Sequence, residues 1–75
     1  LALGLSYVGL QKMYAAKKGN PITVNNRQYW MIGEVSKKFG MRSFVDADAF
    51  LARKYGYMTL IETTSDSYQL WISKK

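Results

Sequence analysis

The chain has 75 residues, no cysteine, no histidine and a formal net charge of +6. A chain of this length makes one domain, which buries only roughly 60% of the surface that the unfolded chain exposes. Without cysteine or histidine it lacks disulfides, the common zinc ligands and the Ser-His and Cys-His nucleophile pairs. We therefore expect one non-enzymatic domain over residues 1–75 with no cofactor, either whole or part of a longer chain. The absence of cysteine leaves the redox compartment open, and we expect a cytoplasmic or other intracellular location.

The first predicted element is a helix over residues 2–18. Its apolar side chains recur at helical spacing, at Leu3, Tyr7, Leu10 and Tyr14. Gly19 ends this helix, and Pro21 prevents it from resuming. The apolar run of residues 1–10 is shorter than the roughly 20 residues of a membrane span. We expect one side of the helix in the core, and membrane attachment is the least favoured alternative.

A brief strand and a second helix are predicted next. Residues 22–24 are β-prone and precede the turn-forming pair Asn25-Asn26. In residues 28–39 the apolar side chains lie at helical offsets, which predicts a helix that Gly40 ends. These side chains are Ile32, Val35 and Phe39.

A third helix is predicted over residues 44–55. Ser43 stands three residues before Asp46, which is the spacing of a capping box at a helix N-terminus. Gly56 favours the end of this helix directly after Tyr55.

A β-hairpin is predicted at the C-terminal end of the chain. Residues 57–63 and 68–73 are rich in β-branched and aromatic side chains, and they flank the polar segment 64–67. Their alternation predicts two faces. One face is expected to hold Met58, Leu60, Tyr68, Leu70 and Ile72, and the other Ile61 and Trp71. We expect Trp71 to pack against the first helix.

The charge is distributed unevenly along the chain. Residues 1–43 hold seven basic side chains against Glu34 alone, whereas residues 44–75 hold four of each sign. The first segment therefore carries the whole net charge of +6. This asymmetry favours a surface that faces a polyanion, such as nucleic acid or anionic lipid. The alternative is that the lysines only keep a small domain soluble.

The order of the predicted elements resembles that of a winged helix-turn-helix domain. Within residues 31–56, Ser36, Gly40 and Met41 occupy the places of the small helix residue, the turn glycine and the apolar residue that follows it. The resemblance implies an α+β fold with three helices and a C-terminal β-hairpin, in the order α-β-α-α-β-β. Asp46 departs from the motif, which has an apolar residue at that place.

The resemblance also implies double-stranded DNA as the partner. Residues 44–55 would lie in the major groove, and residues 64–67 would form the wing beside the backbone. The implied contacts to bases and phosphates come from Lys17, Lys18, Arg27, Lys37, Lys38, Arg42, Ser43, Asp48, Ala49, Arg53 and Lys54. Asp46 and Asp48 start the helix with carboxylates, which repel phosphates.

A protein-interaction module on the same fold is the alternative function, through partner docking or homodimer formation. The acidic start of residues 44–55 and the supply of aromatic anchors favour it. The candidate anchors are Tyr7, Tyr29, Trp30, Tyr57, Tyr68 and Trp71. As individual side chains, Trp30, Phe39, Phe44 and Phe50 are expected in the core.

Overall fold

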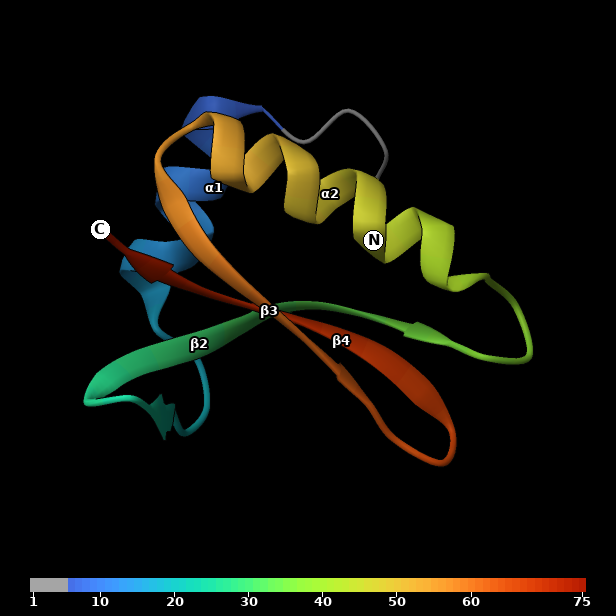
Figure 1. The fold of residues 1–75 in the computed structure, drawn as a ribbon. Coiled ribbons are helices and arrows are strands. Elements are labelled where there is room, and N and C mark those ends of the chain that lie inside the picture. Colours follow the sequence, from blue (N-terminus) through green and yellow to red (C-terminus); the bar gives the residue numbers. More distant parts are fainter. Residues whose placement is uncertain (1–5) are drawn as a thin grey trace.

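The computed structural model describes residues 6–75 and contains two helices and a four-stranded antiparallel sheet (Figure 1). In chain order the elements are α1 (Tyr7–Ala16), β1 (Ile22–Val24), β2 (Arg27–Ser36), α2 (Arg42–Lys54), β3 (Tyr57–Thr63) and β4 (Ser67–Lys74). The strand order is β1-β2-β4-β3, so the last strand lies inside the sheet. In the described part of the chain both helices cover one face of the sheet, and the other face has no helix on it. The expected α+β class is confirmed.

The second predicted helix is wrong, because residues 27–36 form strand β2. A β-bulge between Met31 and Gly33 shifts the alternation of this strand by one residue. Ile32 and Val35 consequently both pack against the core. Their spacing of three is the one that an amphipathic helix produces, so the bulge gives a strand the sequence pattern of a helix.

The turn between β1 and β2 is the local feature that favours the strand. Asn25 and Asn26 have positive φ angles of 52° and 65°, which is the conformation of tight hairpin turns whose twist matches that of the strands. The hairpin pairs Val24 with Arg27 and starts β2 directly after the turn. The described residues therefore hold two helices and not the expected three, in the order α-β-β-α-β-β.

Helix α2 confirms the predicted third helix, apart from its exact bounds. The capping-box prediction is wrong, because Met41 is the N-cap residue and Ser43 lies within the first turn. Gly56 follows the helix with φ of +95°, a left-handed conformation that glycine adopts at little cost. Gly56 therefore predicted the C-terminal end of this helix correctly.

Strands β3 and β4 confirm the predicted hairpin, but the predicted faces of β3 are wrong. Leu60 lies opposite Trp71, and Ile61 lies opposite Leu70. The loop between the last paired positions of β3 and β4 has an even number of residues. Each odd-numbered residue of one strand is therefore paired with an even-numbered residue of the other, and the two side chains lie on the same side of the sheet. Met58 and Leu60 therefore share a face with Trp71, while Ile61 joins Leu70 on the core side.

Trp71 does not lie on the helix-covered side of the sheet. The side chains of its two neighbours in β4, Leu70 and Ile72, both lie in the hydrophobic core. Because successive side chains of a strand point to opposite faces, Trp71 lies on the face without helices. The prediction that Trp71 packs against the first helix is wrong.

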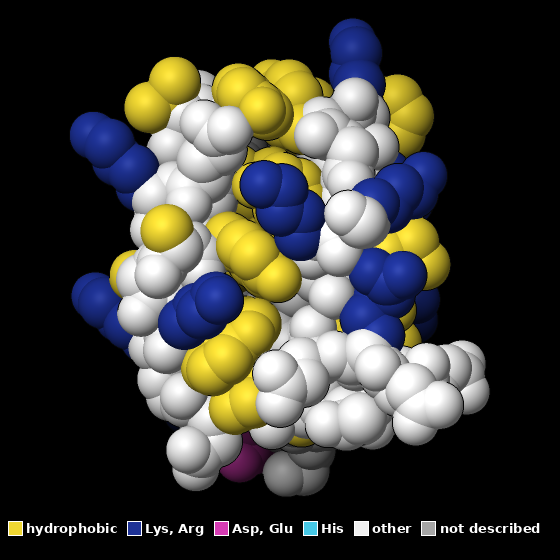
Figure 2. Space-filling model, turned by 90° about the vertical axis from the view of Figure 1, so that its left-hand side faces the viewer, with side chains coloured by type: hydrophobic (Ala, Val, Ile, Leu, Met, Phe, Trp, Pro, Cys, Tyr) yellow, Lys and Arg dark blue, Asp and Glu magenta, His cyan; other side chains and the backbone are white. Residues whose placement is uncertain are grey.

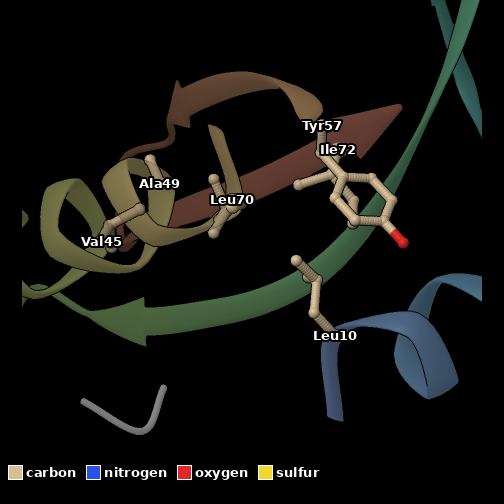
Figure 3. Close-up of a cluster of buried hydrophobic side chains, with 7 residues drawn as sticks. Leu10, Val45, Ala49, Tyr57, Leu70 and Ile72 are labelled. Atoms are coloured by element: carbon tan, nitrogen blue, oxygen red, sulfur yellow. The ribbon is translucent and has the colours of Figure 1, made fainter. Parts of the chain in front are cut away.

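The hydrophobic core lies between the two helices and the sheet (Figure 3). It contains Leu10, Val45, Ala49, Ala52, Tyr57, Leu70 and Ile72. Leu10 is the one fully buried residue of α1, and the half-buried Tyr14 of the same helix also packs against the core. Trp30 and Phe44 are half-buried, whereas Phe39 and Phe50 are 87% and 60% exposed. The prediction that Phe39 and Phe50 lie in the core is therefore wrong.

Candidate nucleic-acid interface

The positive charge gathers at one end of the folded molecule. All five acidic side chains lie between Glu34 and Asp66 in the sequence. Helix α1, the turn between β1 and β2 and the end of β4 lie outside that segment, and Figure 1 shows them together on one side. We call this region the basic end, and its cations are Lys12, Lys17, Lys18, Arg27, Lys74 and Lys75. The other five cations and the five acids cancel, so the basic end accounts for the whole net charge of +6.

The structure thus divides the basic segment that the sequence indicated. Lys37 and Lys38 follow the far end of β2, where the backbone N–H of Lys37 donates to the Asp66 carbonyl at 2.8 Å. Arg42 starts α2, and its Nε lies 3.5 Å from a carboxylate oxygen of Asp46. These three cations share their end of the molecule with acidic side chains, which weakens the positive field there.

A first hollow of about 330 Å³ lies between α1 and β2 at the basic end. Its lining consists of the apolar residues Met13, Ala16, Met31 and Ile32 together with Lys12 and Lys18. Figure 2 views this side and shows a band of hydrophobic side chains with Lys and Arg side chains on both sides of it. An apolar surface edged by ammonium groups suits a ligand that is flat and apolar in one part and anionic in another.

A second hollow of about 470 Å³ lies on the other side of α1, beside Lys17 and Lys74. Tyr14 and Tyr57 meet there edge to face, with ring centroids 5.4 Å apart. The Tyr14 hydroxyl accepts a hydrogen bond from the backbone N–H of Lys74 at 3.2 Å. Burial raises the pKa of the Tyr57 phenol, so this group stays neutral and adds no negative charge to the basic end. Lysines therefore stand on both sides of α1.

One hydrogen bond joins the β1–β2 hairpin to the last strand. Arg27 Nη1 donates to the carbonyl of Lys74 at 2.7 Å. Arg27 follows the tight turn immediately, so the turn fixes where the guanidinium emerges. The contact holds a permanently charged group at the end of the sheet, because arginine does not lose its proton in proteins.

The helix-free face of the sheet carries a row of apolar side chains across three strands. Met31, Trp71 and Leu60 lie side by side on β2, β4 and β3. Met31 is 37% exposed, and Trp71 and Leu60 are half-buried. Met31 also lines the first hollow. The hollow beside α1 and the open face of the sheet therefore meet at this methionine.

A chain of hydrogen bonds holds Trp71 in place. The indole N–H of Trp71 donates to Gln69 Oε1 at 3.2 Å, and Gln69 Nε2 donates to Glu34 Oε2 at 3.0 Å. The same carboxylate oxygen accepts the Ser67 hydroxyl at 2.5 Å. The hydrogen bonds from Ser67 and Gln69 lower the pKa of Glu34, so they favour its ionised carboxylate over the protonated form.

The predicted contact residues are spread over two ends of the molecule and the core. Lys17, Lys18 and Arg27 belong to the basic end. The predicted residues at the other end or along α2 are Lys37, Lys38, Arg42, Ser43, Arg53 and Lys54. Of these, Arg53 donates from Nη1 to Thr59 Oγ1 at 2.9 Å. The structure does not bring the predicted set together as one surface.

Asp48 and Ala49 are both fully buried, which contradicts their predicted contact with bases. They belong to the side of α2 that faces the core, together with Val45 and Ala52. Neither carboxylate oxygen of Asp48 has a hydrogen-bond partner within the described part of the chain. Burial raises the pKa of this carboxyl group.

Lys12, Lys74, Lys75 and Met31 were missed as site residues, and Trp71 was named only as an anchor for a protein partner. For the lysines a signal existed in the sequence, because the chain has no acidic residue before Glu34 or after Asp66. Among residues 6–75 no group of three Asp or Glu side chains is placed to hold a metal ion, and no helix is long and apolar enough to cross a membrane. No protein-family model, curated protein or solved structure matches the chain.

Proposed function

We propose that this chain is a small, non-enzymatic nucleic-acid-binding module that holds the phosphates of DNA at its basic end. The observation that carries the proposal is the separation of charge in space. Six cations lie on α1 and directly after it, beside the turn between β1 and β2, and at the end of β4, and the chain has no acidic side chain before Glu34 or after Asp66. A polyanion gains most from such a surface, because every phosphate that a Lys or Arg neutralises releases a bound counterion.

DNA remains the proposed ligand, but α2 does not act as a recognition helix in this proposal. Residues 31–36, which resemble the first helix of a helix-turn-helix motif, belong to strand β2. The buried position of Asp48 and Ala49 removes two of the residues that were to meet the bases. The cations of the basic end supply the contacts that the resemblance assigned to Lys37, Lys38, Arg42, Arg53 and Lys54.

Charge reversal tests the proposal with a matched control. The double variant Lys12→Glu/Lys18→Glu changes the basic end, and Lys37→Glu/Lys38→Glu makes the same change of net charge at the other end. We expect the first variant to lose about ten-fold or more of its affinity for a labelled DNA at low salt, and to reduce the slope of log K against log salt by about two. The control is expected to keep most of its affinity and its slope. Equal losses would mean that net charge alone drives binding, and absence of binding at low salt contradicts the proposal.

Protein docking is a second candidate function, and one observation favours it. Phe39, Met41 and Phe50 are 87%, 65% and 60% exposed, on the β2–α2 connection and on α2. Large exposed apolar side chains of this kind mark interaction sites more often than single scattered ones do. If they form a contact between two copies, the wild type should sediment as a dimer and Phe39→Ser/Phe50→Ser as a monomer. A monomeric wild type at high concentration contradicts dimerisation through this surface.

A further inference from the structure

We infer that the basic end binds single-stranded nucleic acid, with unpaired bases packed on Met31 and Trp71 and phosphates held by the surrounding cations. This inference rests on the proposed function and names the class of nucleic acid. It starts from the open face of the sheet, where Met31 and Trp71 are cross-strand neighbours. Aromatic and thioether side chains on an uncovered sheet offer flat apolar contact to the face of a base, whatever its sequence.

Trp71 is prepared for stacking before any ligand arrives. Its indole N–H is bound to Gln69, which in turn is bound to Glu34. A ring that is already oriented loses less conformational freedom when a base stacks on it. The hydrogen bond uses the N–H edge of the half-buried ring and not its π-face. The polar chain therefore favours a stacking role for this tryptophan.

The charge along the open face orients the nucleic acid. Arg27 and Lys75 lie at one end of the central strands, and Glu34, Glu62 and Asp66 lie at the other end. Phosphates are attracted to the first end and repelled from the second. The row of Met31 and Trp71 lies between them, so bases reach it while their phosphates stay at the basic end. This leaves room for about two or three bases, the number that a four-stranded sheet stacks in known RNA-binding modules.

Met31 connects this row to the hollow beside α1, where Lys12 and Lys18 stand at the edge. A hollow of about 330 Å³ with an apolar lining matches a single base or nucleoside better than a base pair. In a duplex the faces of the bases are covered by their neighbours in the stack, so only phosphates and groove edges remain available. The apolar part of the basic end is therefore used fully only by unpaired bases.

Intrinsic fluorescence of the full chain tests this inference. The chain has two tryptophans, Trp30 and Trp71, so the variant Trp30→Phe reports on Trp71 alone. It is titrated with oligothymidylate and with a duplex of the same length, at equal salt. We expect the single strand to bind about ten-fold more tightly and to quench Trp71, since stacking on an aromatic side chain raises affinity by about five- to 100-fold per base.

Substitutions separate stacking from charge. Trp71→Ala is expected to lose about five- to 100-fold of the affinity for oligothymidylate, while Trp71→Phe keeps most of it. Phe50→Ala is the matched control, because Phe50 is an exposed aromatic residue outside the basic end. Should Trp71→Ala fail to fold, Met31→Ser gives the same test at an exposed position.

Each outcome decides between the two proposals. Binding of both nucleic acids with no quenching of Trp71, or a duplex that binds more tightly, overturns the single-strand inference and leaves phosphate binding at the basic end intact. Tighter binding of the duplex would favour entry of α1 into a DNA groove. Absence of binding to either nucleic acid at low salt overturns the proposed function as well. Loss of affinity in Phe50→Ala equal to that in Trp71→Ala also contradicts stacking at Trp71.

Discussion

Met31 of β2 lies directly opposite Trp71 of β4, immediately before the bulge in β2. The bulge turns Ile32 toward the core and brings Gly33 opposite Leu70 on that side. Met31 is therefore the last residue of β2 before the alternation shifts. Its side chain belongs to the open face and also borders the hollow beside α1. The geometry of one irregular position thus joins the two parts of the candidate nucleic-acid interface.

Replacing Glu34 with glutamine should loosen Trp71 without removing any contact to ligand. Glu34 accepts hydrogen bonds from Ser67 and Gln69, and both lower its pKa. A lowered pKa contributes stability that is present above the ordinary pKa of a glutamate side chain and is lost as the pH falls through the pKa of the folded state. We therefore expect Glu34→Gln to lower the melting temperature at neutral pH, and the difference from wild type to vanish in acid.

Two measurements check this expectation. The emission of Trp71 in the Trp30→Phe background should shift on Glu34→Gln, because the hydrogen bonds that orient the indole are weakened. Glu62→Gln serves as the control, since Glu62 lies opposite Gln69 on the far side of β4. A melting difference that persists unchanged in acid would show that the charge of Glu34 is not what stabilises this chain of hydrogen bonds.

The elements with strong local signals were predicted from the sequence. Gly56 follows the end of helix α2, and the C-terminal hairpin has strands rich in β-branched and aromatic residues on both sides of a polar turn, so each is specified by neighbouring residues. Strand β2 was not predicted from the sequence, because the bulge places Ile32 and Val35 on one face at helical spacing. The Asn25-Asn26 turn favours the strand locally, and the pairing with the distant strand β4 completes the distinction between the two structures.

The candidate site depended on the same long-range pairing. Lys74 lies beside Arg27 and Tyr14 only in the folded sheet. The charge count along the chain therefore indicated a basic segment but misplaced its surface, since Lys37 and Lys38 lie at the opposite end. The faces of Met58, Leu60 and Ile61 in β3 depended on the length of the loop to β4, where a change of one residue exchanges the two sides of the strand.

Gly40 is a position where any side chain is expected to destabilise the fold. A Cβ atom there would overlap Val35 Cγ2 and lie 3.1 Å from Phe44 Cδ2. Forcing one extra carbon into such a contact costs about 1–3 kcal/mol, so Gly40→Ala should lower the free energy of unfolding by this amount in urea titrations. Val35→Ala/Gly40→Ala should recover part of the loss attributed to the overlap. No loss in the single variant would contradict the close packing.

Asp48 predicts an unusual pH dependence of stability. Its carboxyl group is fully buried, and burial raises its pKa. A raised pKa means that the stability contribution is fully present below the unfolded pKa and is lost as the pH rises through the folded pKa. Asp48→Asn keeps the shape and removes the charge, so it should raise the stability at neutral pH by about 1–3 kcal/mol.

The matched control for this variant is Asp46→Asn, two positions earlier in the same helix. Asp46 is exposed and pairs with Arg42, and an exposed pair of this kind contributes about 0–1 kcal/mol. Asp46→Asn is therefore expected to leave stability nearly unchanged or slightly lower. If Asp48→Asn destabilises the protein at neutral pH, the carboxylate has a compensating partner, and burial alone does not set its effect.

Leu10→Ala tests whether α1 must be docked for binding. Leu10 is the one buried residue of α1, and truncating a buried leucine costs about 2–5 kcal/mol. Because Lys12 lies on that helix and Lys17 and Lys18 follow it directly, its release should increase amide hydrogen exchange in α1 more than in β4 and weaken nucleic-acid binding at low salt. Met13→Ala is the control within the same helix, as Met13 is 38% exposed. If exchange in α1 rises while affinity stays at the wild-type value, the cations of α1 do not act from the docked position, and the interface must be assigned to Arg27, Lys74 and Lys75 alone.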